Sequence, residues 1–382
     1  MPERLRVRFD GARRPLQYEI IIGAGALRRL GEEARRALSP EGRRIALISN
    51  ERVFDLYGEP AIRSLRAARF EPSVWLMKEG ERHKNLRNLG RALEFLSRAG
   101  LERSDAVVAL GGGVVGDLAG FAAATYMRGL AFLQVPTTLL AQIDASVGGK
   151  TGVNLAAGKN LAGAFHQPRA VVVDTSTLDT LPRREMTAGW CEAVKQGAAG
   201  SRPLFHKTVG FLRRQGEDSS HASRLAELIA AQCAFKARVV AHDEREDIER
   251  TDYRSRRILN FGHTTGHALE AATGYRRFRH GEAVGYGMLV AGEVSVRLGL
   301  LDASELELLR DAVRLCGRLP RARDLDQELI SSALSHDKKR VGGYVKWVLL
   351  ERIGRATLVD EREIAPRLLR ASLRAAFGDP VL

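Results

Sequence analysis

The fold is decided by Ala106-Val107-Val108-Ala109-Leu110, which runs directly into Gly111-Gly112-Gly113-Val114-Val115-Gly116-Asp117. Five consecutive apolar residues followed by glycine predict a buried strand of a parallel sheet. The small residues from Leu118 to Thr125 predict a helix that the glycine turn opens. Such a turn lets backbone amides approach a phosphate at the N-terminus of the helix. The stretch therefore predicts a nucleotide-binding α/β domain.

The same turn differs from a standard Rossmann site. Glycines at 111, 113 and 116 fit G-x-G-x-x-G. Glycines at a strand-to-helix turn are, however, often needed only for close packing. The turn follows several strands rather than the first. No Asp or Glu occurs between 118 and 143, where the ribose-binding acid is expected. We therefore expect a different nucleotide-binding sheet, with ribose and adenine contacts supplied from elsewhere.

The segments around this stretch predict two domains. Strands and helices are expected to alternate over 18–22, 26–38, 45–48, 52–68, 74–77 and 86–99. After residue 182, apolar residues recur at spacings of three and four, which predicts helices closed by a short strand pair at 345–348 and 356–359. We expect an α/β domain with a parallel nucleotide-binding sheet over 1–178 and a mainly α-helical domain over 179–382.

The net charge of the chain is strongly positive, which is typical of nucleic-acid-binding proteins. The 382 residues include 60 Lys and Arg against 46 Asp and Glu, a formal net charge of +14. The arginines are spread along the chain, in pairs such as Arg13-Arg14 and Arg276-Arg277, without a basic run interleaved with aromatic residues. We therefore expect a surface that attracts anionic small molecules, and no nucleic-acid partner.

Hydropathy and cysteine content indicate a cytoplasmic protein. No stretch approaches the ~20 consecutive apolar residues of a membrane span. Residues 1–6 lack the apolar core of a signal peptide. Cys191, Cys233 and Cys316 are too few and too scattered for a disulfide framework or a cysteine zinc site. We expect reduced thiols, no export and no membrane partner.

A block rich in threonine, glycine and lysine follows the next apolar strand. Its candidate site residues are Thr137, Thr138, Asp144, Lys150, Lys159 and Asn160. Lysines beside glycine-rich turns suit a phosphate, because the ammonium supplies a point charge and backbone amides donate hydrogen bonds. Either lysine alone indicates an ordinary surface residue, but the density of polar groups favours a binding site.

Histidines in the second half suggest a metal site. His263 and His267 stand four residues apart on one predicted helix face, and His280 follows within 18 positions. Paired histidines with a distant carboxylate form a common catalytic zinc set. Spacing does not decide which of the pair binds metal and which serves as acid, base or hydrogen-bond donor. Glu192, three residues before Lys195, is a candidate carboxylate, although the pair also reads as a plain helical ion pair.

Taken together, these motifs resemble the 3-dehydroquinate synthase family. The resemblance runs from Gly80 to Lys339 and is densest from Gly111 to Pro168. Its sequence blocks are GGGVVGDLAGF, YMRG, VPTTLLAQIDASVGGKTGVN, GKNLAGAFHQP, EAVK, LNFGHTTGHALE and HGEAV. The departures are Gln196 in place of a tyrosine, Thr265 in place of a common aromatic residue, and a few extra residues between Asp243 and Arg256.

The resemblance implies two cofactors and their ligands. Zn2+, with Co2+ as the alternative ion, would be bound by Glu192, His263 and His280. NAD would be bound near its adenosine by Glu81 and Lys84. The remaining implied NAD contacts are Gly113, Val114, Val115, Gly116, Asp117, Thr137, Thr138, Lys150 and Lys159.

The resemblance also implies a substrate site and a homodimer. The implied substrate contacts are Asp144, Lys150, Asn160, Lys195, Lys236, Arg256, Asn260, His267 and one of Lys338 and Lys339. Because of the extra residues before it, Arg256 competes with Arg257 for this assignment. Arg128 would reach into the site of the neighbouring subunit. Lys150, Asn160 and Arg128 would hold the phosphate, whereas Lys236 and Arg256 would bind the carboxylate end or neighbouring hydroxyls.

The implied activity converts 3-deoxy-D-arabino-heptulosonate 7-phosphate to 3-dehydroquinate and phosphate. It proceeds by NAD-mediated transient oxidation, phosphate elimination, reduction and intramolecular aldol closure. One alternative is a related sugar phosphate cyclase such as 2-epi-5-epi-valiolone or 2-deoxy-scyllo-inosose synthase, whose substrates lack the carboxylate. Retention of Lys236, Arg256 and Asn260 favours the first activity. A second alternative, a metal-dependent polyol dehydrogenase, would release NADH.

Overall fold

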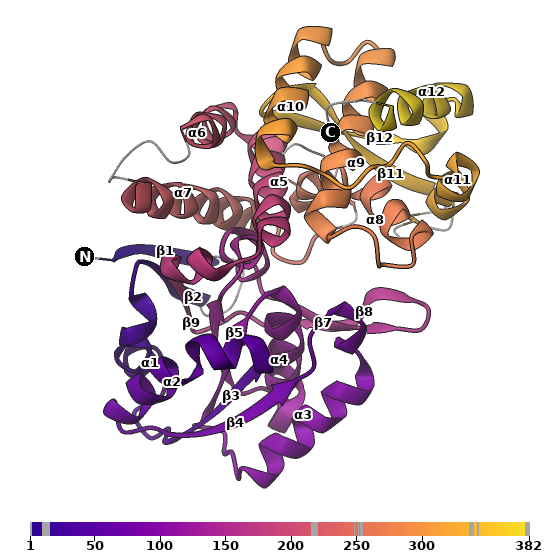
Figure 1. Cartoon of the computed structure of the whole chain (residues 1–382). Helices are drawn as coiled ribbons and strands as arrows, with labels where there is room; N and C mark the ends of the chain where they lie inside the picture. The colour runs from indigo at the N-terminus through magenta and orange to yellow at the C-terminus, as the bar shows by residue number, and fades with distance from the viewer. Residues whose placement is uncertain are drawn as a thin grey trace. The chain divides into compact units, whose positions relative to one another are not determined.

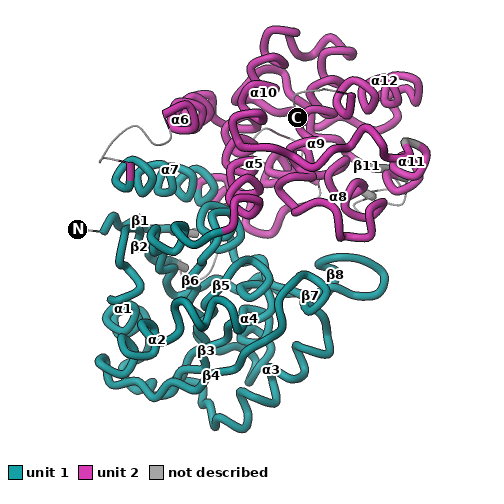
Figure 2. Tube along the Cα trace, in the orientation of Figure 1, with its two compact units in different colours: residues 1–181, 222–237 teal, residues 182–221, 238–382 magenta. Residues whose placement is uncertain are grey.

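The chain forms two units in the computed structural model (Figure 2). The first contains Met1–Leu181 and Ala222–Ala237, and the second contains Pro182–His221 and Arg238–Leu382. The structure describes residues 2–9, 16–214, 221–247, 249–250, 252, 255–335, 340–341 and 344–378.

A seven-stranded sheet runs through the described part of the first unit (Figure 1). Its order is β1 (Glu3–Phe9), β2 (Leu16–Gly23), β9 (Ala170–Asp174), β6 (Ala131–Pro136), β5 (Ala106–Gly111), β3 (Arg44–Asn50) and β4 (Glu71–Met77). The strands from β2 to β4 run parallel, as predicted, whereas β1 pairs antiparallel with β2. The sequence analysis did not assign β1, although Arg4, Arg6 and Arg8 alternate with other residues at the strand period of two.

Helices cover both faces of this sheet. The first face carries η1 (Ala26–Arg29), α1 (Leu30–Ala37) and α2 (Glu51–Ala67); the second carries α3 (Leu86–Arg98) and α4 (Gly113–Thr125). Alternate residues of β5 enter the two cores, with Val108 on the α1–α2 side and Val107 on the α3–α4 side. The apolar run is therefore continuous because both faces of the strand are buried. The segment predicted as one helix at 26–38 divides into η1 and α1.

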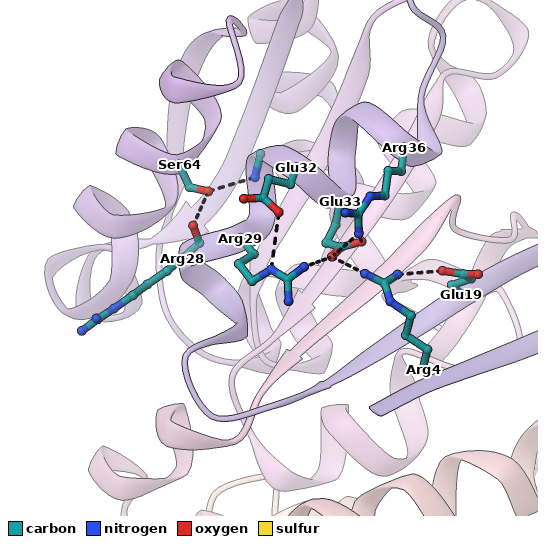
Figure 3. A network of polar contacts seen from close by, with 9 residues as sticks. Arg4, Glu19, Arg28, Arg29, Glu32, Glu33, Arg36 and Ser64 are labelled. Atoms are coloured by element: carbon teal, nitrogen blue, oxygen red, sulfur yellow. Dashed lines mark hydrogen bonds and ion pairs between the residues drawn. The ribbon is translucent and has the colours of Figure 1, made fainter. Parts of the chain in front are cut away.

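A buried carboxylate fastens the edge strand to the first helix (Figure 3). Glu33 on α1 is almost fully buried, and three arginines surround it. Arg4 of β1 lies 2.6 Å from its carboxylate, Arg36 lies 3.0 Å away and Arg29 lies 3.6 Å away. A buried carboxylate needs such compensation, because the charge is costly to remove from water.

Three further segments of the first unit bear on the candidate site. A π-helix at Ala141–Ala145 follows β6. The glycine-rich segment after it forms an antiparallel hairpin of β7 (Lys150–Leu155) and β8 (Gly158–Phe165), which the sequence had indicated only as turns. Residues 222–237 of α7 (His221–His242) pack with this unit, and Cys233 Sγ donates to the carbonyl of Gln142 at 3.2 Å.

The second unit is mainly helical, as predicted. Its helical segments are α5 (Arg183–Gly200), α6 (Arg202–Arg213), η6 (Arg256–Asn260), α8 (His263–Ala272), α9 (His280–Arg297), α10 (Ala303–Cys316), α11 (Gln327–Ser335) and α12 (Pro366–Phe377). The predicted strand pair is present as β11 (Tyr344–Arg352) and β12 (Arg355–Asp360), joined at the edge by β10 (Arg340–Val341). Among the described residues, no helix is long and apolar enough to cross a membrane.

Glycines let α9 approach two neighbouring segments closely. A Cβ atom at Gly281 would lie 1.9 Å from the carbonyl oxygen of Ala188 on α5. One at Gly287 would lie 1.8 Å from the carbonyl oxygen of Gly262, the residue before α8. Both distances are far below van der Waals contact, so any side chain at either position must push backbone apart.

The crossing at Gly287 gives a stability prediction. We expect Gly287→Ala to destabilise the protein by about 1–3 kcal/mol or more, because the added methyl overpacks against backbone that has no rotamer to change. Gly210→Ala on α6 is the matched control, since its Cβ meets only the flexible tip of Arg214 at 3.5 Å. That variant should be neutral or gain roughly 0.5–1 kcal/mol. Urea unfolding checks both, and equal midpoints for Gly287→Ala and wild type would contradict the prediction.

Candidate active site

Three helices of the second unit bring a carboxylate and two imidazoles together. Nε2 of His280 lies 3.5 Å from Glu192 Oε1, and Nε2 of His263 lies 3.9 Å from the same oxygen. His267 is close as well, since ring nitrogens of His263, His267 and His280 all lie within 4.8 Å of one another. Four potential metal ligands therefore converge from α5, α8 and the first turn of α9.

The surroundings of Glu192 fit a bound cation. Its side chain is fully buried, and neither carboxylate oxygen accepts a well-directed hydrogen bond from a described residue. The ammonium of Lys195 lies 2.5 Å from Oε2, an ion pair on one helix face. One ammonium compensates a buried carboxylate only in part, and a divalent cation held with two histidines would complete the compensation. The carboxylate and imidazole donors fit Zn2+ or Co2+.

A second carboxylate fixes the orientation of His280. Nδ1 of His280 lies 3.1 Å from Oε2 of the buried Glu270 on α8. Because a carboxylate accepts hydrogen bonds, Nδ1 carries the proton, and Nε2 would be the nitrogen that binds a cation beside Glu192. Such an outer carboxylate is a frequent companion of metal-binding histidines. The sequence analysis did not select Glu270, and its only signal is its place three residues after His267.

A charged cluster in the first unit surrounds the start of α4. Lys84 is buried, and its ammonium lies 2.9 Å from Asp117 and 3.1 Å from Glu81. Burial by itself lowers the pKa of Lys84, but the two carboxylates raise it above its ordinary value. Burial raises the pKa of Asp117 despite the nearby Lys84. The structure thus brings together three of the predicted NAD contacts, around an ammonium that stays charged.

The glycine turn before α4 has two uses. The N-cap is Gly112, so no side chain caps the first turn of the helix. This first turn contains the predicted pyrophosphate contacts from Gly113 to Asp117. Gly116 also serves packing, because a Cβ there would lie 2.7 Å from the side-chain oxygen of Gln134 on β6. The backbone amides of the turn therefore suit a phosphate. Gly116 also leaves room for the buried side chain of Gln134.

The predicted polar block divides between buried and exposed residues. Thr137 and Thr138 follow β6, and Asp144 lies on the π-helix, where its carboxylate pairs with Lys236 of α7. Lys236 also donates to the Asp144 carbonyl oxygen at 2.5 Å. Lys150 and Asn160 are exposed and Lys159 is half-buried, all on the β7–β8 hairpin. Arg128 is exposed, in a left-handed conformation with φ 67°.

The remaining predicted substrate contacts lie in the second unit. Lys195 and Arg256 are buried, and the guanidinium of Arg256 donates to the carbonyl of Glu244 at 2.7 Å. Arg257 is half-buried on the same short helix. The side chain of Asn260 donates to Glu246 at 2.8 Å, and the sequence analysis did not select this acid. Lys338 and Lys339 lie outside the described residues.

Comparison with known proteins defines the family. The models for the 3-dehydroquinate synthase N-terminal and C-terminal domains match residues 74–188 and 189–340. The 3-dehydroquinate synthase of Pelotomaculum thermopropionicum is 46% identical over 365 residues, which cover 94% of each chain. That of Gloeobacter violaceus is 46% identical over 88% of this chain and 91% of its own. The chain belongs to the 3-dehydroquinate synthase family. This confirms the resemblance predicted from the motifs.

Solved structures of sugar phosphate cyclases share the fold. A 2-deoxy-scyllo-inosose synthase, solved with carbaglucose-6-phosphate, NAD+ and Co2+, superposes with a TM-score of 0.84 at 27% identity over 98% of this chain and 100% of its own. The 2-epi-5-epi-valiolone synthase of Streptomyces hygroscopicus subsp. jinggangensis 5008, solved with NAD+ and Zn2+, has a TM-score of 0.84 at 27% identity over 96% of this chain and 98% of its own. A glycerol dehydrogenase of Schizosaccharomyces pombe, with a TM-score of 0.65 at 14% identity over 94% of this chain and 88% of its own, shows the fold alone.

Two of the departures from the 3-dehydroquinate synthase pattern, Gln196 and Thr265, are buried next to candidate site residues in sequence. Gln196 follows Lys195 on α5, and Thr265 lies between His263 and His267 on α8. The hydroxyl of Thr265 has no hydrogen-bond partner among the described residues. Neither substitution removes one of the four potential metal ligands, and nothing in the structure explains either of them.

The geometry predicts how metal affinity depends on two carboxylates. We expect Glu192→Gln to abolish measurable Zn2+ binding, because the variant loses a charged oxygen ligand. Glu270→Gln should raise the Zn2+ dissociation constant roughly 10–100-fold, because His280 loses its charged orienting partner. Competition with a chromogenic chelator measures both values.

Glu293→Gln is the control, because Glu293 is a buried acid of α9 whose carboxylate pairs with Arg297 and Arg310. Its Zn2+ affinity should equal that of the wild type. Wild-type affinity in Glu270→Gln would show that the Glu270 contact does not hold the imidazole in place.

Proposed function

We propose that this enzyme converts 3-deoxy-D-arabino-heptulosonate 7-phosphate to 3-dehydroquinate and phosphate. The observation that carries the proposal is the near-complete match to proteins named 3-dehydroquinate synthase, at 46% identity over 94% of the chain. Cyclases of other names share the fold at 27% identity.

The cofactors proposed for this chain are NAD and a divalent cation, Zn2+ or Co2+. They supply a hydride acceptor that is regenerated in each turnover and Lewis-acid stabilisation of negative charge on oxygen. Glu192, His263 and His280 would hold the cation. Glu81, Lys84 and the first turn of α4 would bind the nucleotide, with Thr137, Thr138, Lys150 and Lys159 as the further contacts.

The protein's own residues would orient the substrate by its charged ends. Lys150 and Asn160 would bind the phosphate, where an ammonium and an amide both donate hydrogen bonds. Lys236 and Arg256 would bind the carboxylate end or neighbouring hydroxyls. Lys195 and His267, which lie beside the cation ligands, would contact the carbon centre that is oxidised. Asp144, Asn260 and one of Lys338 and Lys339 complete the proposed set.

The overall activity is tested by following phosphate and NADH together. We expect phosphate release from 3-deoxy-D-arabino-heptulosonate 7-phosphate to require NAD and Zn2+ or Co2+, without lasting accumulation of NADH. The reason is that the hydride taken from the substrate returns to it in the same turnover. Stoichiometric NADH would indicate a dehydrogenase. Turnover of sedoheptulose 7-phosphate instead would indicate a related cyclase.

We propose that the enzyme is a homodimer in which Arg128 completes the site of the neighbouring subunit. Arg128 is exposed, and both it and Met127 adopt left-handed backbone, with φ values of 67° and 48°. Such strain persists where a residue must be aimed at a functional site. An exposed arginine so held is suited to binding a phosphate of a second chain's substrate.

Subunit mixing tests this assignment. Arg128→Ala and Glu192→Gln should each be nearly inactive alone. When equal amounts are unfolded together and refolded, the subunits pair at random and each mixed dimer should contain one intact site. The mixture should therefore regain about a quarter of wild-type activity. The control is each variant refolded by itself. No recovery in the mixture would show that Arg128 serves its own subunit.

We propose a cytoplasmic location, in keeping with the cysteine chemistry. Cys191, Cys233 and Cys316 are free and buried. Burial raises the pKa of Cys233 to about 12, which keeps this thiol protonated and unreactive. Free thiols suit a reducing compartment.

A further inference from the structure

Asn154 occupies an irregular position on the β7–β8 hairpin. Val153 pairs with Ala162 and Leu155 pairs with Gly158, with a register shift between the two pairs that falls at Asn154. Its backbone instead bridges to Asn85, and its N–H donates to the carbonyl of Lys84 at 2.8 Å. The strand therefore leaves the hairpin ladder at this residue and joins the turn that contains Glu81 and Lys84.

The side chain of Asn154 connects that turn to the other strand of the hairpin. The backbone N–H of Asn160 donates to Asn154 Oδ1 at 2.9 Å. Asn154 Nδ2 lies 2.8 Å from Glu81 Oε1. A backbone N–H can only donate, so Oδ1 must face Asn160 and Nδ2 must face Glu81. The orientation of the amide is therefore fixed by its two partners.

An amide is one of the few side-chain groups suited to both contacts. It donates to a carboxylate with one end and accepts from a backbone N–H with the other. Glu81 is ionised here: burial raises its pKa, but Lys84, Lys159 and the bond from Asn154 bring it below the ordinary value. An aspartate in place of Asn154 would set a second carboxylate against Glu81.

The contact also holds an unfavourable backbone conformation. Asn160 has φ 54°, in the left-handed region that most residues avoid. Its N–H is fixed by Asn154, and Lys159, the preceding residue, adds its charge to the surroundings of Glu81. One side chain therefore links the turn that carries Glu81 and Lys84 to the segment that carries Lys159 and Asn160.

We propose that Asn154 is a positioning residue that couples nucleotide binding at Glu81 and Lys84 to phosphate binding at Asn160. The proposal rests on the function proposed above, in which the first pair binds the adenosine end of NAD. A ligand that orders one segment also orders the other. Binding of either ligand therefore lowers the free-energy cost of ordering the site of the other ligand. By linkage, the effect on the two affinities is reciprocal.

Titration calorimetry of the holo-zinc protein tests the coupling, with inorganic phosphate as the anion. In the wild type, saturating phosphate should tighten NAD binding by roughly 5-fold or more, within the usual range of coupling between sites. In Asn154→Ala this factor should fall to about 1. Wild-type coupling in the folded variant would overturn the proposal, as would the absence of coupling in the wild type.

Ser64→Ala is the matched control. The Ser64 hydroxyl accepts from the N–H of Gly31 at 2.9 Å and donates to the carbonyl of Arg28 at 2.8 Å, so it also links two segments of the first unit (Figure 3). Its loss removes a comparable pair of hydrogen bonds away from Glu81. The coupling factor should stay at the wild-type value. An equal loss of coupling in this control would mean that general destabilisation, and not Asn154, explains the result.

Asn154→Asp gives an independent readout that does not depend on phosphate. Glu81 then faces the introduced carboxylate as well as Lys84, Lys159 and, across Lys84, Asp117. Mutual repulsion raises the pKa of the carboxylate pair, and the protonated member can donate the missing hydrogen bond. We therefore expect NAD binding to this variant to be weak at about pH 8 and to strengthen at least roughly 5-fold by about pH 5.5, a larger change than in the wild type. An equal pH dependence in both proteins would contradict the contact between residue 154 and Glu81.

Failure of the proposed function gives a different result. Glu81→Ala should weaken NAD binding in the absence of phosphate. If the wild type binds no NAD, or if Glu81→Ala binds it normally, the assignment of the nucleotide site is wrong. The coupling proposal is then wrong as well. If both behave as expected and Asn154→Ala keeps its coupling, only the role of Asn154 is wrong.

Discussion

The candidate metal centre depends on the close approach of α9 to its neighbours at two glycines. At Gly281 and Gly287 no side chain separates α9 from the carbonyl oxygens of Ala188 and Gly262. Ala188 lies one helical turn before Glu192, and Gly262 directly precedes His263. His280 begins α9 itself. Backbone contact without intervening side chains thus fixes the spacing of three potential ligands that lie far apart in sequence.

The same constraint explains why a buried carboxylate is tolerated at Glu192. Packed helices cannot move apart to admit water, so the charge must be compensated by groups that the helices themselves carry. Lys195 supplies one positive charge from the same face of α5. The imidazoles of His263 and His280 approach the other oxygen, with His280 oriented by Glu270. A rigid frame and an incompletely satisfied carboxylate together make a preorganised cation site.

Much of this organisation was predictable from local patterns. The strand at 106–110 and the helix after it follow from one apolar run and its glycines, because both faces of the strand are buried. The histidine pair on α8 follows from a spacing of four. By contrast, the contacts of Glu246, Glu270 and Asn154 depend on tertiary structure, since acids and amides at ordinary spacings carry no signal of their partners. The hairpin at 150–165 was read as turns because its glycines, Gly152 and Gly163, obscure the strand pattern, yet they allow the two strands to lie close.

The fold by itself leaves the substrate open, since synthases named for different products share it at a TM-score of 0.84. The choice of substrate must therefore depend on individual side chains, above all on buried charged groups that a matching ligand would compensate. Arg256 is a candidate for this selection, because its guanidinium is buried and always charged. Asp243 accepts from its backbone N–H, and Glu244 accepts from the side chain through a neutral carbonyl oxygen. In the role proposed for Arg256, its guanidinium would bind a substrate carboxylate more strongly than the hydroxyls of a neutral sugar end, because hydrogen bonds between two charged groups are the stronger ones.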